Sequence, residues 1–346
     1  MKIAVVNSGS SSLKFKLLEL PSGTVLEEKF VEHIGEEHSE IKDHHQALEA
    51  LAIDFSEIDV IGHRVVHGGE KFHSTVLIND EVVETIRELI PLAPLHNPAN
   101  LEGIEVMQKF APNIPQVAVF DTAFHSSLQK EAYMYALPYE MYEKNHIRRY
   151  GFHGTSHSYL LKEAAKLLNK EPEETNLISL HLGNGESICA IKNGKSLDIS
   201  MGFTPLEGLM MGSRSGDLDA EIVLYMQKSL NLSVEEVDTI LNKKSGLIGV
   251  CGENDIRQIL DRNDERAKLA IKMMVRRIHK YIGAYFMLLD GEVDAIVFSG
   301  GIGENSQVIR EKILDKEILK NLKSFVIKTD EELEIARECY QVVKKV

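Results

Sequence analysis

The stretch Leu177-Ile-Ser-Leu-His-Leu-Gly-Asn-Gly-Glu-Ser-Ile-Cys-Ala-Ile191 has an apolar run, a polar turn with two glycines and a second apolar run. The turn dipeptide Asn193-Gly194 follows, and Lys195–Ser200 continues the chain. Short apolar runs bounded by glycine turns are typical of antiparallel strands. The stretch therefore predicts a meander of three strands.

The same layout occurs at the start of the chain. The apolar residues Ile3–Val6 lead into the turn Asn7-Ser-Gly-Ser-Ser-Ser12, and Leu13–Leu20 form a second run. Pro21-Ser22-Gly23 then turns the chain before a third strand at Thr24. Two halves that open in the same way indicate two similar α/β domains.

A second repeat supports this duplication. In both Ile58–Gly69 and Val293–Gly301 a buried-strand pattern ends in a pair of glycines. Between the strands, Asp264 is a candidate N-cap of a long helix that ends at Gly291, and Ser158–Asn169 predicts a shorter amphipathic helix.

Composition restricts the class of protein. The chain has 346 residues, 43% of them hydrophobic, which is enough for two domains with a sizeable core. Its 39 basic and 53 acidic residues give a net charge of −14, which argues against a nucleic-acid partner. Three widely spaced cysteines favour a reduced compartment. With no signal peptide and no apolar run long enough for a membrane span, we expect a cytoplasmic protein without membrane contact.

The irregular segment Met201–Asp219 is the strongest candidate for a binding surface. It contains glycines, two aspartates and a single arginine, Arg214, between Ser213 and Ser215. A loop of this length is more often functional than a simple connector. The arginine is suited to bind a phosphate or a carboxylate.

Several motifs together resemble the acetate kinase family, from Asn7 to Glu331. They are the 201–219 segment and Gly62-His-Arg-Val-Val-His-Gly-Gly-Glu70, Ala93-Pro-Leu-His-Asn-Pro-Ala-Asn100, Phe120-Asp-Thr-Ala-Phe-His125, Tyr150-Gly-Phe-His-Gly-Thr-Ser-His157 and Ser299-Gly-Gly-Ile-Gly-Glu-Asn305. The resemblance implies an α/β fold of two duplicated actin-like (ribonuclease H-like) domains with an active-site cleft between them. It places residues 1–125 and 332–346 in the first domain and residues 126–331 in the second. Nucleotide binding and dimerisation are assigned to the second domain.

The resemblance also implies a nucleotide and metal site. Neither G-x-x-x-x-G-K-[ST] nor G-x-G-x-x-G is present, so the phosphates must be held by other glycine turns. By similarity Asn7 and Glu331 bind Mg²⁺, for which Mn²⁺ is a possible substitute. The expected ATP/ADP contacts are Lys14, His181, Leu182, Gly183, Asn184, Gly185, Asp255, Ile256, Arg257, Gly301, Ile302, Gly303, Glu304 and Asn305. Two positions depart from the family, Glu186 in place of a further glycine and Cys251-Gly-Glu-Asn254 in place of a serine-rich segment.

The catalytic residues implied by the resemblance are Arg64, Asp121, His153 and Arg214. Arginines bind the acceptor carboxylate and the transferring phosphoryl group, because a guanidinium holds oxygens of both anions. Asp121 would act near the metal, and His153 would donate to a phosphoryl oxygen. The acceptor pocket is predicted from Arg64, Val66, Leu95, Phe152 and Pro205.

Several of these candidate residues could instead have purely structural roles. Locally, Asp121 is equally suited to be a helix N-cap, Glu331 to be a first-turn acid, and the turn at Asn7 to be an ordinary hairpin. The pairs His63/His67 and His153/His157 have the i, i+4 spacing of zinc ligands on a helix, but they lie in strand or glycine-broken contexts, so zinc is not favoured.

The predicted activity is reversible ATP:acetate phosphotransfer, giving acetyl phosphate and ADP in a homodimeric enzyme. A kinase of propionate or butyrate and a non-catalytic actin-like nucleotide-binding module are the alternatives, with a zinc hydrolase a distant third. The chain is shorter than typical family members between Asn305 and Thr329, where Lys316–Ser324 replaces a longer segment.

Overall fold

The computed structural model describes residues 1–9, 11–36, 38–94, 96–345. They divide into two compact units. Unit 1 comprises Met1–Ser126, Gly154–Tyr159 and Asp330–Val346, and unit 2 comprises Ser127–His153 and Leu160–Thr329. The expected boundaries, 1–125 with 332–346 and 126–331, thus differ from these units at Ser126, Gly154–Tyr159 and Asp330–Glu331, and as folding domains they stay a prediction.

Within the described residues, unit 1 is built on a six-stranded sheet of order β3-β2-β1-β4-β6-β5. The strands are β1 (Lys2–Ser8), β2 (Ser12–Glu19), β3 (Thr24–Glu32), β4 (Val60–Val65), β5 (Val76–Leu77) and β6 (Gln116–Phe120). The first three form an antiparallel meander, and β4 and β6 run parallel to β1.

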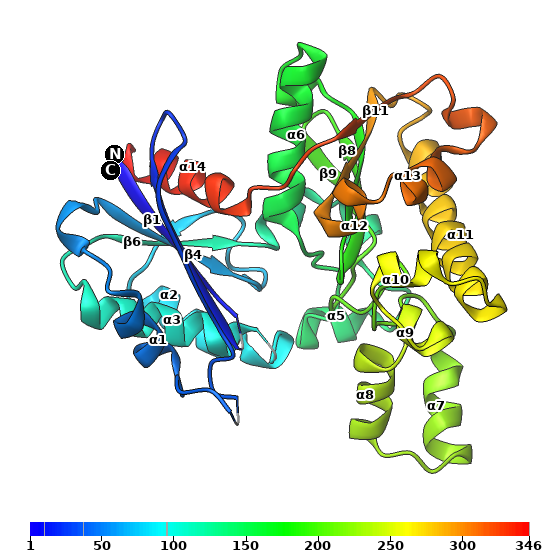
Figure 1. Cartoon of the computed structure of the whole chain (residues 1–346), viewed down its shortest axis with the longest axis horizontal. Helices are drawn as coiled ribbons and strands as arrows, with labels where there is room; N and C mark the ends of the chain where they lie inside the picture. Colours follow the sequence, from blue (N-terminus) through cyan, green and yellow to red (C-terminus); the bar gives the residue numbers. More distant parts are fainter. Residues whose placement is uncertain (10, 37, 95, 346) are drawn as a thin grey trace. The chain divides into compact units, whose positions relative to one another are not determined.

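Alternating side chains bury both faces of this sheet. Ala4 and Val6 of β1 face the core formed with α1 (His44–Leu51) and α3 (Asn97–Phe110). Ile3 and Val5 face the opposite core, which α14 (Glu331–Val343) covers. Figure 1 shows α1 and α3 on one side of β1 and β4, and α14 on the other.

Unit 2 repeats this plan. Within the described residues its five-stranded sheet has the order β11-β10-β7-β8-β9. The strands are β7 (Leu177–Leu182), β8 (Glu186–Lys192), β9 (Lys195–Ile199), β10 (Ala295–Ser299) and β11 (Lys323–Val326). Again a meander of three antiparallel strands comes first, and two parallel strands follow beside its first strand. The predicted duplication of the α/β plan is confirmed.

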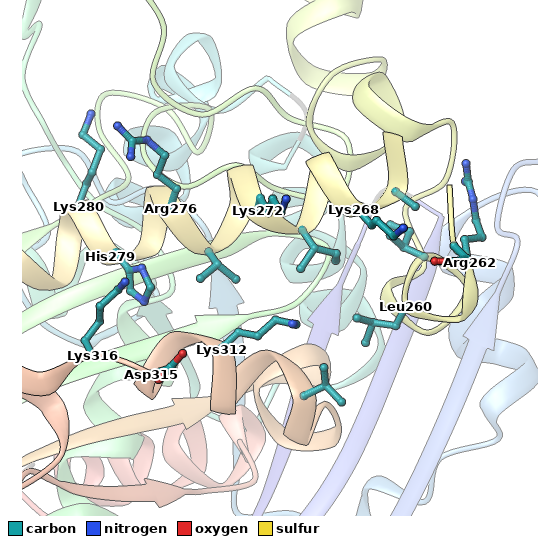
Figure 2. A pocket seen from close by; sticks show the side chains of 16 residues that line it. Leu260, Arg262, Lys268, Lys272, Arg276, His279, Lys280, Lys312, Asp315 and Lys316 are labelled. Atoms are coloured by element: carbon teal, nitrogen blue, oxygen red, sulfur yellow. The ribbon is translucent and has the colours of Figure 1, made fainter. Parts of the chain in front are cut away.

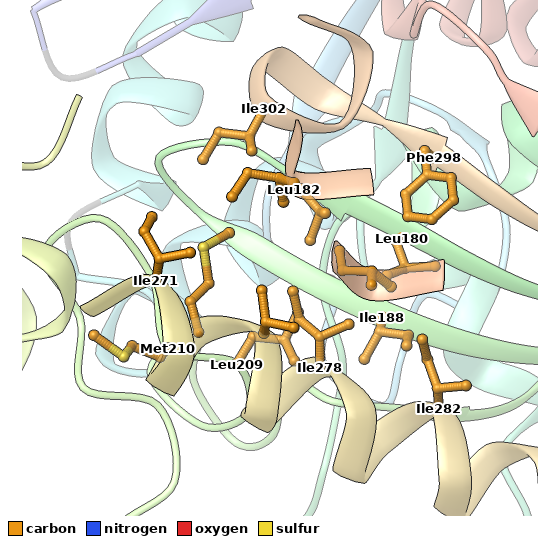
Figure 3. Packing of buried hydrophobic residues seen from close by; sticks show 14 of the residues in the cluster. Leu180, Leu182, Ile188, Leu209, Met210, Ile271, Ile278, Ile282, Phe298 and Ile302 are labelled. Carbon is orange, nitrogen blue, oxygen red and sulfur yellow. The ribbon is translucent and has the colours of Figure 1, made fainter. Parts of the chain in front are cut away.

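The long helix α11 (Glu265–Leu288) closes one face of the second sheet. Asp264 caps it as predicted, since its side chain accepts from the amides of Arg266 and Ala267. Buried residues of α11 pack against Leu180, Leu182 and Ile188 of the strands (Figure 3). Leu209 and Met210 enter the same core. The 201–219 segment is therefore anchored to the sheet through its apolar residues.

The remaining helices connect and flank the two sheets. They are α2 (Asp80–Glu88), α4 (Lys130–Tyr133), α5 (Tyr139–Asn145), α6 (Gly154–Leu168), α7 (Ala220–Ser229), α8 (Val234–Lys243), α9 (Gly246–Cys251), α10 (Ile256–Asp261), α12 (Gly300–Asn305) and α13 (Gln307–Leu314). The start expected at Ser158 was wrong, because α6 begins at Gly154. Among the described residues, no helix has both the length and the apolar character of a membrane span.

Candidate active site

The turn Gly183–Gly185 between β7 and β8 lies at the centre of the candidate site in unit 2. A Cβ atom at Gly185 would stand 3.5 Å from Nη1 of Arg214 and 3.6 Å from the ring of His153. At Gly183 it would stand 3.8 Å from the amide nitrogen of Gly301 and 4.0 Å from Nε2 of His181. His153, Arg214 and Gly301 are far apart in the sequence, and the fold gathers them around one glycine turn.

Two histidines lie side by side here. The rings of His153 and His181 are 4.3 Å apart, and Nδ1 of His153 lies 2.9 Å from Oγ of Ser187. His153 has the left-handed conformation, with φ of 57°, at the N-cap of α6. The hydroxyl of Ser187 thus fixes the orientation of the ring, and Nε2 faces the side of Gly185.

Arg214 is a half-buried cation that no carboxylate neutralises in the described part of the chain. Its Nη1 donates to the carbonyl of Pro205 at 3.3 Å and lies 3.8 Å from Sδ of Met211. Burial lowers the pKa of the guanidinium below its ordinary value. Unpaired buried charge is costly, and an anion beside Arg214 would offset that cost.

Three residues outside the motifs hold the loop that carries Arg214. Arg277 of α11 donates to the carbonyls of Gly208 and Asp217 at 2.8 and 3.0 Å. The hydroxyl of Tyr281, one turn further on, donates to the Asp217 carboxylate. Arg149 donates to the carbonyl of Met201 at 3.0 Å. These anchors could not be predicted from the sequence, because an arginine or tyrosine side chain carries no local sign of its long-range partner.

A cavity of ≈ 950 Å³ opens from the glycine turn. Of the predicted nucleotide contacts, those that line it are Gly183, Asn184, Asp255, Ile256, Arg257, Gly301, Ile302 and Asn305. Its size suits a ligand such as a nucleotide. Gly183 and Asn184 of the turn line the cavity, whereas Arg214, His153 and His181 do not, so the cavity adjoins these three groups through the glycine turn.

Asp255 and Arg257 form one wall of this cavity. Nε and Nη2 of Arg257 donate to the two carboxylate oxygens of Asp255 at 3.0 and 2.6 Å. Hydrogen bonds from the Arg257 side chain and amide lower the pKa of Asp255 to about 2. Glu253, in the segment that departs from the family, accepts from the amides of Asn254 and Asp255. Its carboxylate orders the start of α10.

The other predicted nucleotide residues do not line the cavity. Leu182 is fully buried in the core of unit 2, and Gly303 is buried beside it. Glu304 accepts from the amides of Gly300 and Thr329, both at 3.0 Å, so its carboxylate holds the start of α12. His181 and Gly185 lie at the turn, and Lys14 belongs to unit 1.

Unit 1 carries a second group of charged residues around Asp121. Arg64 of β4 donates to Oδ2 through Nε at 3.1 Å and Nη2 at 2.5 Å. Thr155 donates to Oδ1 at 2.8 Å, and the amide of Gly154 donates to the Asp121 carbonyl at 2.9 Å. Thr155 was not predicted as a site residue. Both carboxylate oxygens are therefore fixed, and the alternative of Asp121 as a helix N-cap has no support here.

Glu331 lies on the other side of Arg64, with Oε2 at 3.7 Å from Nε. Burial opposes the charge of Arg64, but the carboxylates of Asp121 and Glu331 raise its pKa above the ordinary value. Burial raises the pKa of Glu331 to about 7 against the attraction of Arg64, and the nearby Asp121 and Glu332 carboxylates add to this rise. Lys14 pairs with Glu332 at 3.1 Å. The acids here outnumber the cations.

Asn7 and Glu331, the predicted metal ligands, both belong to unit 1. Asn7 pairs with Lys14 in the β1–β2 ladder, and α14, whose first residue is Glu331, packs against β1. Across the described residues no three His, Cys, Asp or Glu side chains are grouped as metal ligands. The carboxylate oxygens of this group and the side-chain amide oxygen of Asn7 are nevertheless hard donors of the kind that Mg²⁺ prefers.

The predicted acceptor pocket draws on both units. Val66 is buried in unit 1, and its amide donates to the Asn100 side chain at 3.0 Å. Phe152, which is buried, and Pro205 belong to unit 2. Leu95 lies outside the described residues. The pocket thus stays a prediction.

Duplicated sheets of this topology, with a nucleotide-sized cavity at a glycine turn, are typical of the actin-like class of phosphotransferases. The Acetokinase family profile matches residues 40–344. The chain is 53% identical to the acetate kinase of Sulfurimonas denitrificans over 389 aligned positions, covering 99% of this chain and 100% of that protein. It is 47% identical to the acetate kinase of Campylobacter concisus, covering 100% and 99%. The chain belongs to the acetokinase family, as predicted.

Solved structures agree with this assignment. Porphyromonas gingivalis acetate kinase superposes with a TM-score of 0.92 at 41% identity, and a propionate kinase from Francisella tularensis with 0.93 at 42%, each covering 99% of both chains. A putative N-acetylmannosamine kinase from Listeria monocytogenes, at 15% identity and a TM-score of 0.53, shares the fold. The predicted actin-like fold class is confirmed.

Proposed function

We propose that this chain transfers the γ-phosphoryl group of ATP to acetate, forming acetyl phosphate and ADP, and that it catalyses the reverse reaction. The observation that carries the proposal is Arg214, which lies beside His153 at the Gly185 turn and has no carboxylate partner among the described residues. Gly183 and Asn184 of the same turn line the nucleotide-sized cavity, which supports a nucleotide beside this arginine. The names of the two acetate kinases given above support acetate as the acceptor.

The chemistry needs positioned charge more than proton transfer. A carboxylic acid with a pKa of about 4 is already ionised at neutral pH, so acetate is a nucleophile without a general base. Its oxygen forms a bond to the γ-phosphorus as the bond to the β–γ bridging oxygen breaks, and ADP leaves. Arg214 and His153 would stabilise the charge on the transferring phosphoryl oxygens.

The residues of unit 1 would bind and orient the other reactants. Arg64, held by Asp121, would bind the acetate carboxylate, and Lys14 would attract nucleotide phosphates. Asn7 and Glu331 would hold Mg²⁺, which supplies charge neutralisation for the polyphosphate when bound. A divalent cation would also relieve the accumulation of carboxylates at Glu331.

Propionate is the second candidate acceptor, because a propionate kinase is among the similar structures. Val66, Phe152 and Pro205, with Leu95, would limit acceptor size. An extra methylene in a fitted apolar pocket is worth roughly 1–3 kcal/mol. We therefore place acetate before propionate and butyrate.

We also retain a homodimer and a cytoplasmic location as parts of the proposal. Both come from the resemblance and from the sequence, which has widely spaced cysteines and no apolar run of membrane length.

An acyl-hydroxamate assay with ATP, Mg²⁺ and acetate, propionate or butyrate tests the proposal. Acetate is expected to give the highest kcat/KM, and omission of Mg²⁺ to abolish product. Failure to form any acyl phosphate in a folded protein that binds ATP would support the non-catalytic alternative.

A further inference from the structure

Arg149 and Glu207 form an ion pair in unit 2 to which the proposed chemistry assigns no role. Nη2 of Arg149 lies 2.6 Å from Oε1 of Glu207, and the two side chains are 16% and 31% exposed. Burial opposes the charge of Arg149, but the Glu207 carboxylate raises the pKa of the guanidinium above its ordinary value. The arginine therefore stays charged, and its planar fork of donors can hold several acceptors at once.

Both members of the pair make further hydrogen bonds to the start of the 201–219 segment. Nη1 of Arg149 faces three successive backbone carbonyls at 3.0, 3.3 and 3.0 Å, those of Ile199, Ser200 and Met201. The hydroxyl of Tyr135 donates to Oε2 of Glu207 and accepts from the amide of Phe203 at 2.8 Å. The ion pair and Tyr135 together therefore fix the backbone at the start of this segment.

The same ion pair joins this segment to the one that carries His153. Arg149 is followed directly by Tyr150 and Gly151, whose amides donate to the carbonyl of Gly202 at 3.1 and 3.2 Å. A Cβ atom at Gly202 would collide with the carboxylate of the ion pair, so a glycine is needed for this close approach. His153 comes two residues after Gly151, and its position therefore depends on this junction.

Arg214 depends on the other member of the pair. Its Nη1 donates to the carbonyl of Pro205 at 3.3 Å, two residues before Glu207. A Cβ atom at Gly185 would stand 3.5 Å from this Nη1 and 3.6 Å from the ring of His153. The placement of the guanidinium relative to the imidazole thus depends on how the two segments are fastened to each other, and the ion pair fastens them.

We propose that Arg149 and Glu207 are positioning residues, which set the placement of Arg214 relative to His153 and thereby the rate of phosphoryl transfer. The inference rests on the proposed function, because these two groups are the ones assigned to the transferring phosphoryl group. A misplacement of about 1 Å in an active site can cost about 10²-fold in rate. The alternative is an ion pair that only stabilises the fold, and the two roles predict different kinetics.

Arg149→Met should lower kcat about tenfold or more through this misplacement. The KM for ATP should stay within about twofold of wild type, because neither member of the pair lines the nucleotide-sized cavity. Arg149→Lys should restore little, because one ammonium group cannot hold the Glu207 carboxylate and the backbone carbonyls together. Glu207→Gln keeps the shape of the side chain, so it tests the pair if Arg149→Met does not fold, and it should lower kcat about threefold or more.

A comparison of double variants separates positioning from stability. In an Arg214→Ala or a His153→Ala background the two groups can no longer be aligned, so Arg149→Met should change kcat by less than about twofold. A purely stabilising role predicts the same fractional loss of kcat in every background. That result would overturn the proposal, and so would wild-type kcat in a folded Arg149→Met or Glu207→Gln variant.

Arg87→Met and Arg276→Met are the matched controls. Arg87 pairs with Glu105 in unit 1 through the same atoms, Nη2 and Oε1, at the same distance of 2.6 Å. Arg276 is an exposed arginine of α11 beside a separate cavity of ≈ 980 Å³ between α10, α11 and α13 (Figure 2). Both variants should keep wild-type kcat. A loss in either control as large as in Arg149→Met would contradict a role specific to the Arg149–Glu207 pair.

Amide hydrogen exchange of the full chain tests the junction independently of activity. The amides of Tyr150, Gly151 and Phe203 should exchange faster in Arg149→Met than in wild type and at the wild-type rate in Arg276→Met. Unchanged exchange in Arg149→Met would overturn the positioning role even in an active kinase. If wild type formed no acyl phosphate, the proposed function would fail, and the exchange rates would still decide whether the pair links the two segments.

Discussion

Arg64 and Asp121 form a two-point ion pair at the ends of neighbouring parallel strands, with Nε and Nη2 of the arginine on the same carboxylate oxygen at 3.1 and 2.5 Å. Because the pair fixes the guanidinium, Asp121→Asn should weaken the orientation of Arg64 and lower kcat. Arg64→Ala should lower kcat and also raise KM for acetate. Steady-state kinetics at saturating ATP measure both, and wild-type kinetics of Arg64→Ala would remove the residue from the site.

Arg214 should contribute mainly in the transition state. We expect Arg214→Ala to lower kcat by about 10²–10³-fold, as for the loss of a preorganised donor to developing charge. Arg214→Lys should restore little, because a lysine cannot reproduce the planar pair of donors. The far-ultraviolet circular dichroism of both variants should match wild type. A kcat within twofold of wild type would contradict the assignment.

Arg277 should affect catalysis without touching substrate. Its bonds to Gly208 and Asp217 hold the loop of Arg214, so Arg277→Met should lower kcat by about tenfold or more through misplacement of that cation. Arg276→Met is the matched control, since it changes the adjacent, exposed side chain. Equal kcat in the two variants would show that the loop needs no such anchor.

Much of the fold and part of the site could be predicted from the sequence, because glycine turns and alternating strands are local patterns. The meander of β7–β9 and the cap at Asp264 are examples. Side-chain direction was harder, since His181 and Leu182 alternate across one strand and only His181 lies at the turn. The sequence did not reveal the roles of Thr155, Glu253 and Arg277, because their hydrogen-bond partners are backbone groups or residues far away in the chain.

Glu186 should make stability depend on pH. Its carboxyl group is fully buried, and neither oxygen has a hydrogen-bond partner among the described residues. Burial raises its pKa well above 4.5, so the native state keeps a proton that the unfolded chain releases. The stability contributed by this proton is complete below pH 4.5 and is lost as pH rises from there towards the folded pKa, by up to about 1.4 kcal/mol per pH unit.

Glu186→Gln should remove this component. Urea unfolding of wild type and of Glu186→Gln at several pH values from 4.5 upward measures this component. The stability of Glu186→Gln relative to wild type should increase with pH. A constant difference between the two proteins would show that Glu186 is ionised in the native state.

Val66→Ala should change the choice of acceptor. The substitution removes two methyl groups from a buried side chain without altering charge, so kcat/KM for propionate relative to acetate should rise. Leaving the ratio unchanged would remove Val66 from the acceptor pocket. Val82→Ala, at another buried valine of the same unit, is the control for a loss of core packing outside the acceptor pocket.

Phosphoryl transfer to acetate is tested most directly by ³¹P NMR after mixing the enzyme with Mg²⁺, ATP and acetate. We expect acetyl phosphate and ADP in equal amounts, the reverse conversion from acetyl phosphate and ADP, and loss of both reactions in Arg214→Ala. Release of inorganic phosphate from ATP at the same rate with and without acetate, and no acetyl phosphate, would contradict it.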